Sequence, residues 1–89
     1  MTKKQKQALE NLRNRVLEVF GPNPVSIEAV ISVARQELKY GIPQIAAIFE
    51  LNQGDIRRFL DKGLVPPYFE SAFRRHFTLN KVYNYEYEY

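Results

Sequence analysis

The chain has 89 residues, of which 45% are hydrophobic and 26% are charged, and its formal net charge is +3. A chain of this length forms one small domain that buries roughly 60–65% of its unfolded surface, so dimerisation would add useful stability. With no cysteine and a single histidine, the chain is neither a disulfide scaffold, a zinc finger nor a thiol enzyme.

The first half of the chain is predicted to form two amphipathic helices. Residues 3–20 repeat apolar side chains at helical spacing, and Thr2 is placed to cap them. Glycine and proline at residues 21–24 end this helix. Ser26 is placed to cap a second helix to about residue 39, with a strand over residues 30–33 as the alternative, and Tyr40-Gly41 is expected to stop it. The expected core faces comprise Ala8, Leu9, Leu12, Val16, Val19 and Phe20, and then Ile27, Val30, Ile31, Ala34 and Leu38.

Two short helices, residues 42–51 and 53–62, follow with a hinge at Asn52. Asn52 suits an N-cap, Asp55 favours the positive end of the second helix, and Gly63 supplies a left-handed stop. Pro43 falls in the first turn of the first helix, where its missing N–H costs nothing. The apolar faces are expected to be Ile45, Ala46, Ile48 and Phe49 and then Ile56, Phe59 and Leu60, with Gln53, Arg57, Arg58 and Asp61 on the opposite face.

This pair of helices resembles the helix-turn-helix of phage-repressor, Cro-type and resolvase-like DNA-binding proteins. The resemblance covers residues 42–63, about a quarter of the chain. Those proteins usually have glycine at the turn position that Glu50 holds, because glycine suits a positive φ best. Either Asn52 takes that conformation here, or the turn is built differently. The matching residues are Ala46 inside the first helix, Leu51 after the turn, the pair Ile56 and Phe59, and the string LNQGDIRRFL.

The resemblance implies that the second helix enters the major groove of DNA and that its first residues reach base edges. Gln53 then suits adenine and the arginines suit guanine. The alternative is that the arginines only pair with acids such as Asp61 on an exposed face. The implied base-contacting residues are Asn52, Gln53, Gly54, Arg57 and Arg58, and the expected phosphate-contacting residues are Gln44, Lys62, Arg74, Arg75, Lys3, Lys4 and Lys6.

The last part of the chain is predicted to form a fifth helix and a tail. Residues 67–77 place Phe69, Phe73 and Phe77 at four-residue steps, which indicates a core stripe. His76 is expected to be solvated or close to a phosphate. Residues 82–89 alternate tyrosine with asparagine or glutamate at the spacing of a strand. That tail either pairs with a second subunit or a partner, or it is an unpacked terminus.

These patterns together predict an all-α domain of five helices over residues 1–81, with the helix-turn-helix at 42–63 and a Tyr/Glu tail at 82–89. We expect a sequence-specific binder of double-stranded DNA, a transcriptional regulator of phage or mobile-element type that acts as a homodimer, with the tail as a candidate contact between the subunits. The alternative is a protein-binding module or inhibitor that acts on another protein through the fifth helix and the tail.

An enzyme is a poor fit to this sequence. It has no glycine-rich phosphate loop, no nucleophile within a histidine motif and no metal-ligand spacing. We therefore expect no catalytic residue, metal, cofactor or small-molecule ligand. No apolar run approaches the roughly 18–20 residues that span a bilayer, and the basic start is not a secretory signal. A cytoplasmic location, without membrane contact, is the expectation.

Overall fold

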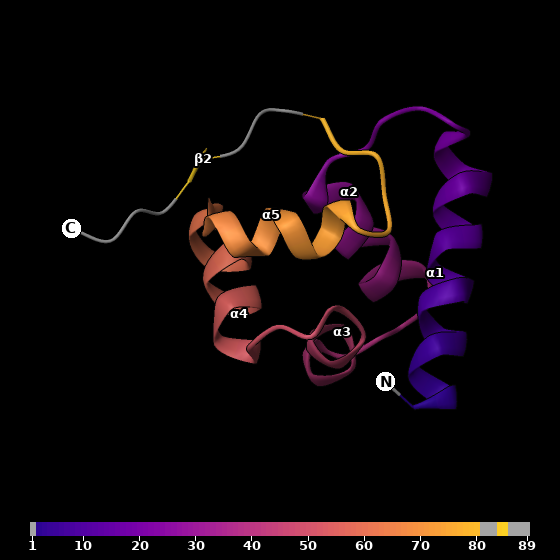
Figure 1. The fold of residues 1–89 in the computed structure, drawn as a ribbon, viewed down its shortest axis with the longest axis horizontal. Helices are drawn as coiled ribbons and strands as arrows, with labels where there is room; N and C mark the ends of the chain where they lie inside the picture. Colours follow the sequence, from indigo (N-terminus) through magenta and orange to yellow (C-terminus); the bar gives the residue numbers. More distant parts are fainter. Residues whose placement is uncertain (1, 81–83, 86–89) are drawn as a thin grey trace.

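The computed structural model describes residues 2–80 and 84–85, and this part of the chain contains five α-helices (Figure 1). The predicted all-α fold is confirmed, with one pair of two-residue strands added to it. The elements in chain order are α1 (Lys3–Phe20), α2 (Ile27–Ser32), the π-helical segment η1 (Val33–Glu37), α3 (Ile42–Phe49), α4 (Gln53–Lys62), β1 (Leu64–Val65), α5 (Pro67–Arg74) and β2 (Asn84–Tyr85).

Helix α1 has the predicted bounds because both of its ends are capped. The Gln5 N–H donates to Thr2 Oγ1 at 3.1 Å, and the Thr2 N–H donates to Gln5 Oε1 at 3.0 Å. At the other end, the backbone φ of Gly21 is 69°. The predicted core face is wrong in its last turn, where Val19 and Phe20 are 43% and 38% exposed. Burial on α1 stops at Val16, so the helix continues past the layer that covers it.

Helix α2 begins as predicted, with the Ala29 N–H donating to Ser26 Oγ at 3.0 Å. The strand alternative is excluded, but the prediction of one α-helix to residue 39 is wrong. After Ser32 the backbone widens into η1, where the Leu38 N–H donates to the Val33 carbonyl at 3.2 Å.

The chain leaves η1 through a left-handed residue, and that residue is Lys39, with a φ of 61°. The predicted stop at Tyr40-Gly41 is therefore misplaced, because Gly41 has a φ of −78° and precedes α3 as its N-cap. The Tyr40 hydroxyl donates to the Ala8 carbonyl at 3.0 Å, which ties this turn to α1.

The turn between α3 and α4 is built on Glu50. Its φ and ψ are 57° and 44°, so α3 ends at Phe49 and not at Leu51 as predicted. The Leu51 N–H donates to the Ala46 carbonyl at 2.8 Å, which completes a Schellman closure. Asn52 has a φ of −76° and is the N-cap of α4, although its side chain makes no capping hydrogen bond. The left-handed conformation considered for Asn52 therefore belongs to Glu50.

Helix α5 contributes the aromatic centre of the core. The Phe73 ring stacks on Phe49 of α3 with centroids 4.0 Å apart, and the Phe69 ring meets Phe59 of α4 edge-on at 5.7 Å. The predicted phenylalanine stripe is thus confirmed for Phe69 and Phe73, which are both fully buried. These contacts fix α3 and α4 against a common support.

The predicted end of the fifth helix at residue 77 is wrong, because α5 ends at Arg74. The His76 and Phe77 N–H groups both donate to the Phe73 carbonyl at 3.0 Å, which makes a turn there. Phe77 is only half-buried. The chain then passes beside the α1–α2 connection, where the Val25 N–H donates to the Thr78 carbonyl at 2.9 Å.

Part of the predicted tail is a strand. Within the same chain, β2 pairs in parallel with β1, with Leu64 opposite Asn84 and Val65 opposite Tyr85. The rest of the predicted tail, residues 82–83 and 86–89, lies outside the described residues.

Candidate nucleic-acid interface

Helix α4 has one face in the core and one in solvent. On the inner face, Ile56 is fully buried and Phe59 is 8% exposed. Leu60 was expected on this face, but it is 37% exposed because it lies at the edge of the buried stripe. The outer surface carries all of the residues expected to contact bases, and each of them is exposed: Asn52, Gln53, Gly54, Arg57 and Arg58.

Asp55 is buried and connects α4 to α5. Its side chain was expected to face the positive end of α4, and it does lie in the first turn. The Tyr68 hydroxyl of α5 donates to Asp55 Oδ2 at 2.8 Å. Since this carboxylate is 8% exposed and hydrogen-bonded, it holds the start of α4 in place and is turned away from any partner.

On the outer face of α4, Arg57 has its hydrogen-bond partner within the same helix. The Arg57 guanidinium donates from Nη2 to Gln53 Oε1 at 3.3 Å, one helical turn earlier. The described residues contain no ion pair between Arg57 and Asp61, which was the alternative role considered for this arginine. A Cβ added to Gly54 would meet nothing within 4 Å. The surface at the start of α4 is therefore open.

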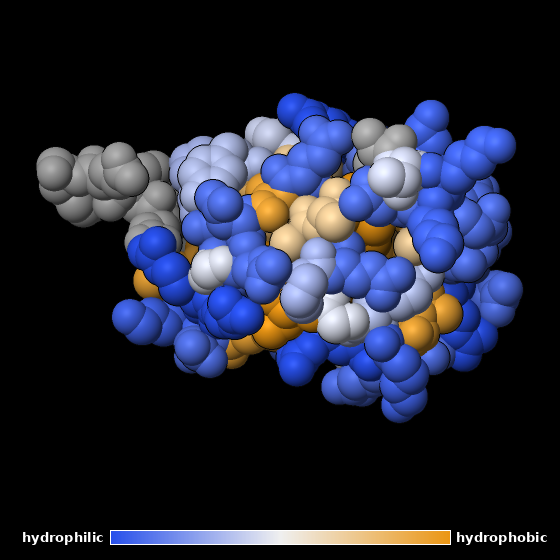
Figure 2. All heavy atoms as spheres, turned by 90° about the horizontal axis from the view of Figure 1, so that it is seen from below, coloured by the Kyte–Doolittle hydropathy of each residue, from blue (hydrophilic) through white to orange (hydrophobic). Residues whose placement is uncertain are grey.

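The residues expected to contact phosphate are all exposed, but they do not form one cluster. The starts of α1, α3 and α4 lie toward the lower side of the molecule in Figure 1. Lys3, Lys4 and Lys6 belong to the start of α1, and Gln44 belongs to the start of α3. Figure 2 views this side and shows hydrophilic side chains over most of it. Lys62 lies at the opposite end of α4, and Arg74 and Arg75 lie at the end of α5.

Several basic side chains are paired with acids of the same protein. Arg13 and Glu10 of α1 are 3.8 Å apart, and Arg15 Nε donates to Glu37 Oε1 of η1 at 2.6 Å. Arg15 also pairs with Glu18 at 2.9 Å, and Arg74 pairs with Glu70 on α5. These cations already have an acidic neighbour.

A groove of about 790 Å³ lies between η1, the turn before α3, and α4. Three basic side chains from these three elements line it, Arg35, Lys39 and Arg57, against the single acid Glu28. Sequence reasoning did not select Arg35 or Lys39 as site residues. Their four-residue spacing on the polar side of the predicted second helix was the signal that could have found them.

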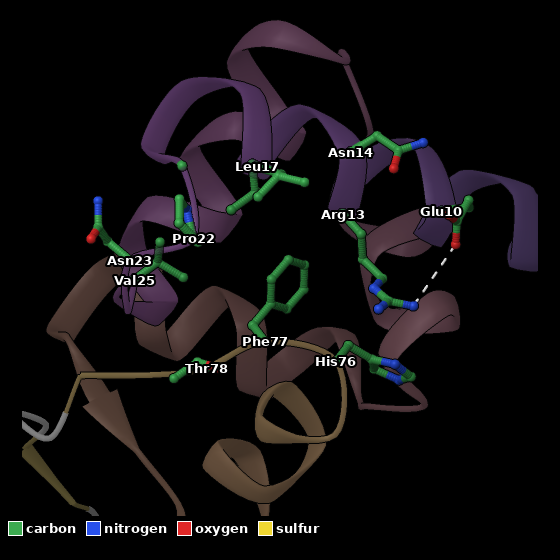
Figure 3. A pocket seen from close by; sticks show the side chains of 12 residues that line it. Glu10, Arg13, Asn14, Leu17, Pro22, Asn23, Val25, His76, Phe77 and Thr78 are labelled. Carbon is green, nitrogen blue, oxygen red and sulfur yellow. Dashed lines mark ion pairs between the residues drawn. The ribbon is translucent and has the colours of Figure 1, made fainter.

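A smaller pocket of about 230 Å³ lies between α1 and the turn that follows α5 (Figure 3). Phe77 points into its middle, and His76 lies at its edge near the Arg13–Glu10 pair. Burial lowers the pKa of His76 from its ordinary value, and the positive charges of Arg13 and Arg75 lower it further. His76 is half-buried and not fully solvated as expected.

Neither a metal centre nor a membrane span is evident in the part of the chain that the structure describes. No three side chains among His, Asp and Glu are grouped there to hold a metal ion. None of the described helices has both the length and the apolar composition needed to cross a bilayer. A scan of family models and searches of curated proteins and of solved structures found no match to this chain.

Proposed function

We propose that this protein binds double-stranded DNA in a sequence-specific manner, with α3 and α4 acting as a helix-turn-helix and α4 lying in the major groove. The observation that carries this proposal is the outer face of α4. Gln53, Gly54 and Arg57 are exposed there, while Ile56 and Phe59 hold the inner face of the same helix in the core. A fixed helix that presents polar side chains at its N-terminal end suits base readout.

The turn before α4 supports this proposal. Helix-turn-helix proteins of the type that this sequence resembles usually have glycine at the position of Glu50, and Glu50 has the positive φ that glycine favours. The small Ala46 of α3 is 4% exposed, and the apolar Leu51 after the turn packs partly against the core. The residues that carry the resemblance thus occupy suitable environments.

The outer side chains of α4 suit contacts with base edges. A glutamine amide can bond adenine in both directions, and an arginine fork can bond guanine, so Gln53, Arg57 and Arg58 are the proposed base readers. The hydrogen bond from Arg57 to Gln53 holds two of these side chains beside each other. Gly54 lets the backbone approach the DNA closely. Asp61 would repel phosphate, which limits how much of α4 can lie in the major groove.

The biological role that we propose is transcriptional regulation of the phage or mobile-element type, by a homodimer in the cytoplasm. A two-fold dimer would bind two half-sites about one helical turn of DNA apart, roughly 34 Å between centres. Phosphate contacts from Lys3, Lys4, Lys6, Gln44, Lys62, Arg74 and Arg75 would position the protein without specifying sequence.

Selection of a duplex from a random library, followed by a salt titration of its affinity, tests this function. We expect one preferred site and an affinity that falls steeply with salt. Arg57→Ala should weaken binding to that site by about 1–3 kcal/mol and relax the preference at one base pair. Arg13→Gln, which removes a paired charge on α1, is the matched control. Affinity that depends on neither salt nor sequence would contradict the proposal.

One observation favours the alternative, a module that binds another protein through α5 and the tail. Tyr68 on α5 is 55% exposed, and tyrosine is enriched at protein interfaces. If this alternative is right, truncation of the tail should abolish binding to the partner protein, while Arg57→Ala should leave that binding intact.

A further inference from the structure

We propose that the groove between η1 and α4 holds the sugar–phosphate backbone of the DNA strand beside α4, with Arg35 and Lys39 contacting its phosphates. This inference rests on the proposed function and extends the contact surface beyond the helix-turn-helix. The groove has a volume of about 790 Å³, and Arg57 of the proposed base-reading face is one of its lining residues. A DNA strand that meets the outer face of α4 would therefore continue into the groove.

The charges in the groove carry the argument. Arg35, Lys39 and Arg57 come from three separate elements and line one groove. Among the described residues, none of the three forms an ion pair with a carboxylate. A polyanion that binds several such cations releases its own counterions, which favours binding.

Two arginines of α1 provide a contrast. Arg13 and Arg15 each have a glutamate partner on the protein. Neutralised pairs of this kind have less to gain from a phosphate, because the phosphate must displace a carboxylate that is already present. Among the described residues no carboxylate competes for the groove cations in this way, so the groove has the charge that a phosphate requires.

The apolar residues of the groove fit a nucleic-acid backbone as well. Leu60 is 37% exposed and Ile42 is half-buried, and both line the groove beside the basic residues. Deoxyribose offers apolar C–H surface between successive phosphates, so a strand presents partners for both the charged and the apolar side chains that line the groove. Glu28 lines the groove too and would repel phosphate, which marks the limit of the contact.

The test is the salt dependence of binding to the duplex selected by the wild-type protein, measured by fluorescence anisotropy. Arg35→Gln and Lys39→Gln should each reduce the slope of log affinity against log salt by about 0.9, which is the value for one phosphate contact in B-DNA. Base preference should not change, because phosphate contacts do not read sequence. Both residues are exposed, so both variants should fold, and circular dichroism checks this.

Arg13→Gln is the matched control, because it removes the same charge from a paired arginine outside the groove. It should change the slope by much less than the groove variants do. Equal slopes for Arg35→Gln, Lys39→Gln and the wild type, with Arg57→Ala still weakening the site, would overturn the groove assignment and leave the proposed function standing. Wild-type protein without salt-dependent duplex binding would overturn both. Loss of binding to a glutamate-rich peptide in the groove variants, with duplex binding unchanged, would assign the groove to a protein partner and contradict our inference.

Discussion

The two faces of α4 differ in what holds their side chains. On the inner face, Phe59 meets Phe69 of α5 edge-on, and Asp55 accepts a hydrogen bond from Tyr68. On the outer face, the hydrogen bond between Arg57 and Gln53 stays within the helix itself. The inner face therefore determines where α4 lies, and the exposed side chains of Gln53 and Arg57 on the outer face are available to a partner. Substitutions on the two faces should accordingly change different measured quantities.

The largest expected effect is on the inner face. Phe59→Ala should lower the free energy of unfolding by about 3–5 kcal/mol, because it removes a buried ring and leaves a cavity beside Phe69. Urea denaturation followed by circular dichroism measures this. Phe20→Ala, on the exposed last turn of α1, is the matched control and should cost less than about 1 kcal/mol. Similar losses for the two variants would show that the inner face of α4 is not packed as described.

An outer-face substitution should leave stability nearly unchanged and affect binding. Gln53→Ala removes an exposed side chain, so we expect a change in unfolding free energy within about 0.5 kcal/mol. Affinity for the selected duplex should fall by about 1–3 kcal/mol if the amide bonds an adenine. Loss of stability in this variant without loss of affinity would reverse the roles of the two faces.

The contact between Tyr68 and Asp55 should have an intermediate effect. Tyr68→Phe keeps the ring and removes the hydroxyl that donates to the buried carboxylate. We expect a loss of about 1 kcal/mol in unfolding free energy, since Tyr68 itself is largely exposed. Thermal denaturation at neutral pH measures it. A variant as stable as the wild type would mean that the hydrogen bond does not help to fix α4.

Gly54 offers a substitution with opposite effects on the two quantities. Gly54→Ala should raise stability by about 0.5 kcal/mol, because alanine favours the helix and its Cβ meets nothing within 4 Å. Affinity for DNA should fall if the backbone approaches the duplex there. Gly63→Ala is the control and should lower stability, since Gly63 has a φ of 70°. Improved stability together with unchanged affinity would remove Gly54 from the interface.

The smallest expected effect concerns His76, which lies on neither face of α4. Its pKa is lowered in the folded protein, mainly by burial, from an ordinary value of 6.5. The unfolded chain therefore binds a proton at His76 more readily than the folded chain does. The neutral His76 side chain contributes stability that is complete above pH 6.5 and is lost as the pH falls through the lowered pKa of the folded protein. His76→Gln should lose less stability than the wild type between pH about 7.5 and about 5.5. If the unfolding free energies of the wild type and His76→Gln change in parallel with pH, His76 makes no such contribution.

The sequence was sufficient to place the helices because their ends carry strong local signals. Thr2, Ser26 and Gly63 act as predicted at helix ends, and the bounds of α1 and α4 are those expected. The errors occur where tertiary contacts determine the burial or the backbone conformation of a residue. Nothing local shows that α1 continues past its covering layer, and so Phe20 was wrongly placed in the core.

The stop after the second helix was misplaced, and of the two alternatives for the turn before α4 the structure has the one in which Asn52 does not take the positive φ. Lys39 and Glu50 have positive φ, although each residue type avoids that conformation. Rules based on residue preference pointed to Gly41 for the first turn and offered Asn52 as one of two alternatives for the second. Closure of the chain onto the core determined the actual positions.

In the candidate site, too, local patterns were predicted correctly and contacts between distant segments were not. Helical spacing placed Gln53, Gly54, Arg57 and Arg58 on one exposed surface, and the structure has them exposed. The groove was not predicted, because Arg35 and Lys39 are 22 and 18 residues from Arg57 in the sequence and meet it only through the packing of η1 against the rest of the fold.

The most direct test of the DNA-binding proposal is an NMR titration of the ¹⁵N-labelled protein with the selected duplex. We predict that the largest amide shift changes fall at residues 52–58, with further changes at Arg35 and Lys39 and only small ones around Tyr68 on α5. Changes concentrated on α5 around Tyr68, with the start of α4 unaffected, would contradict the account.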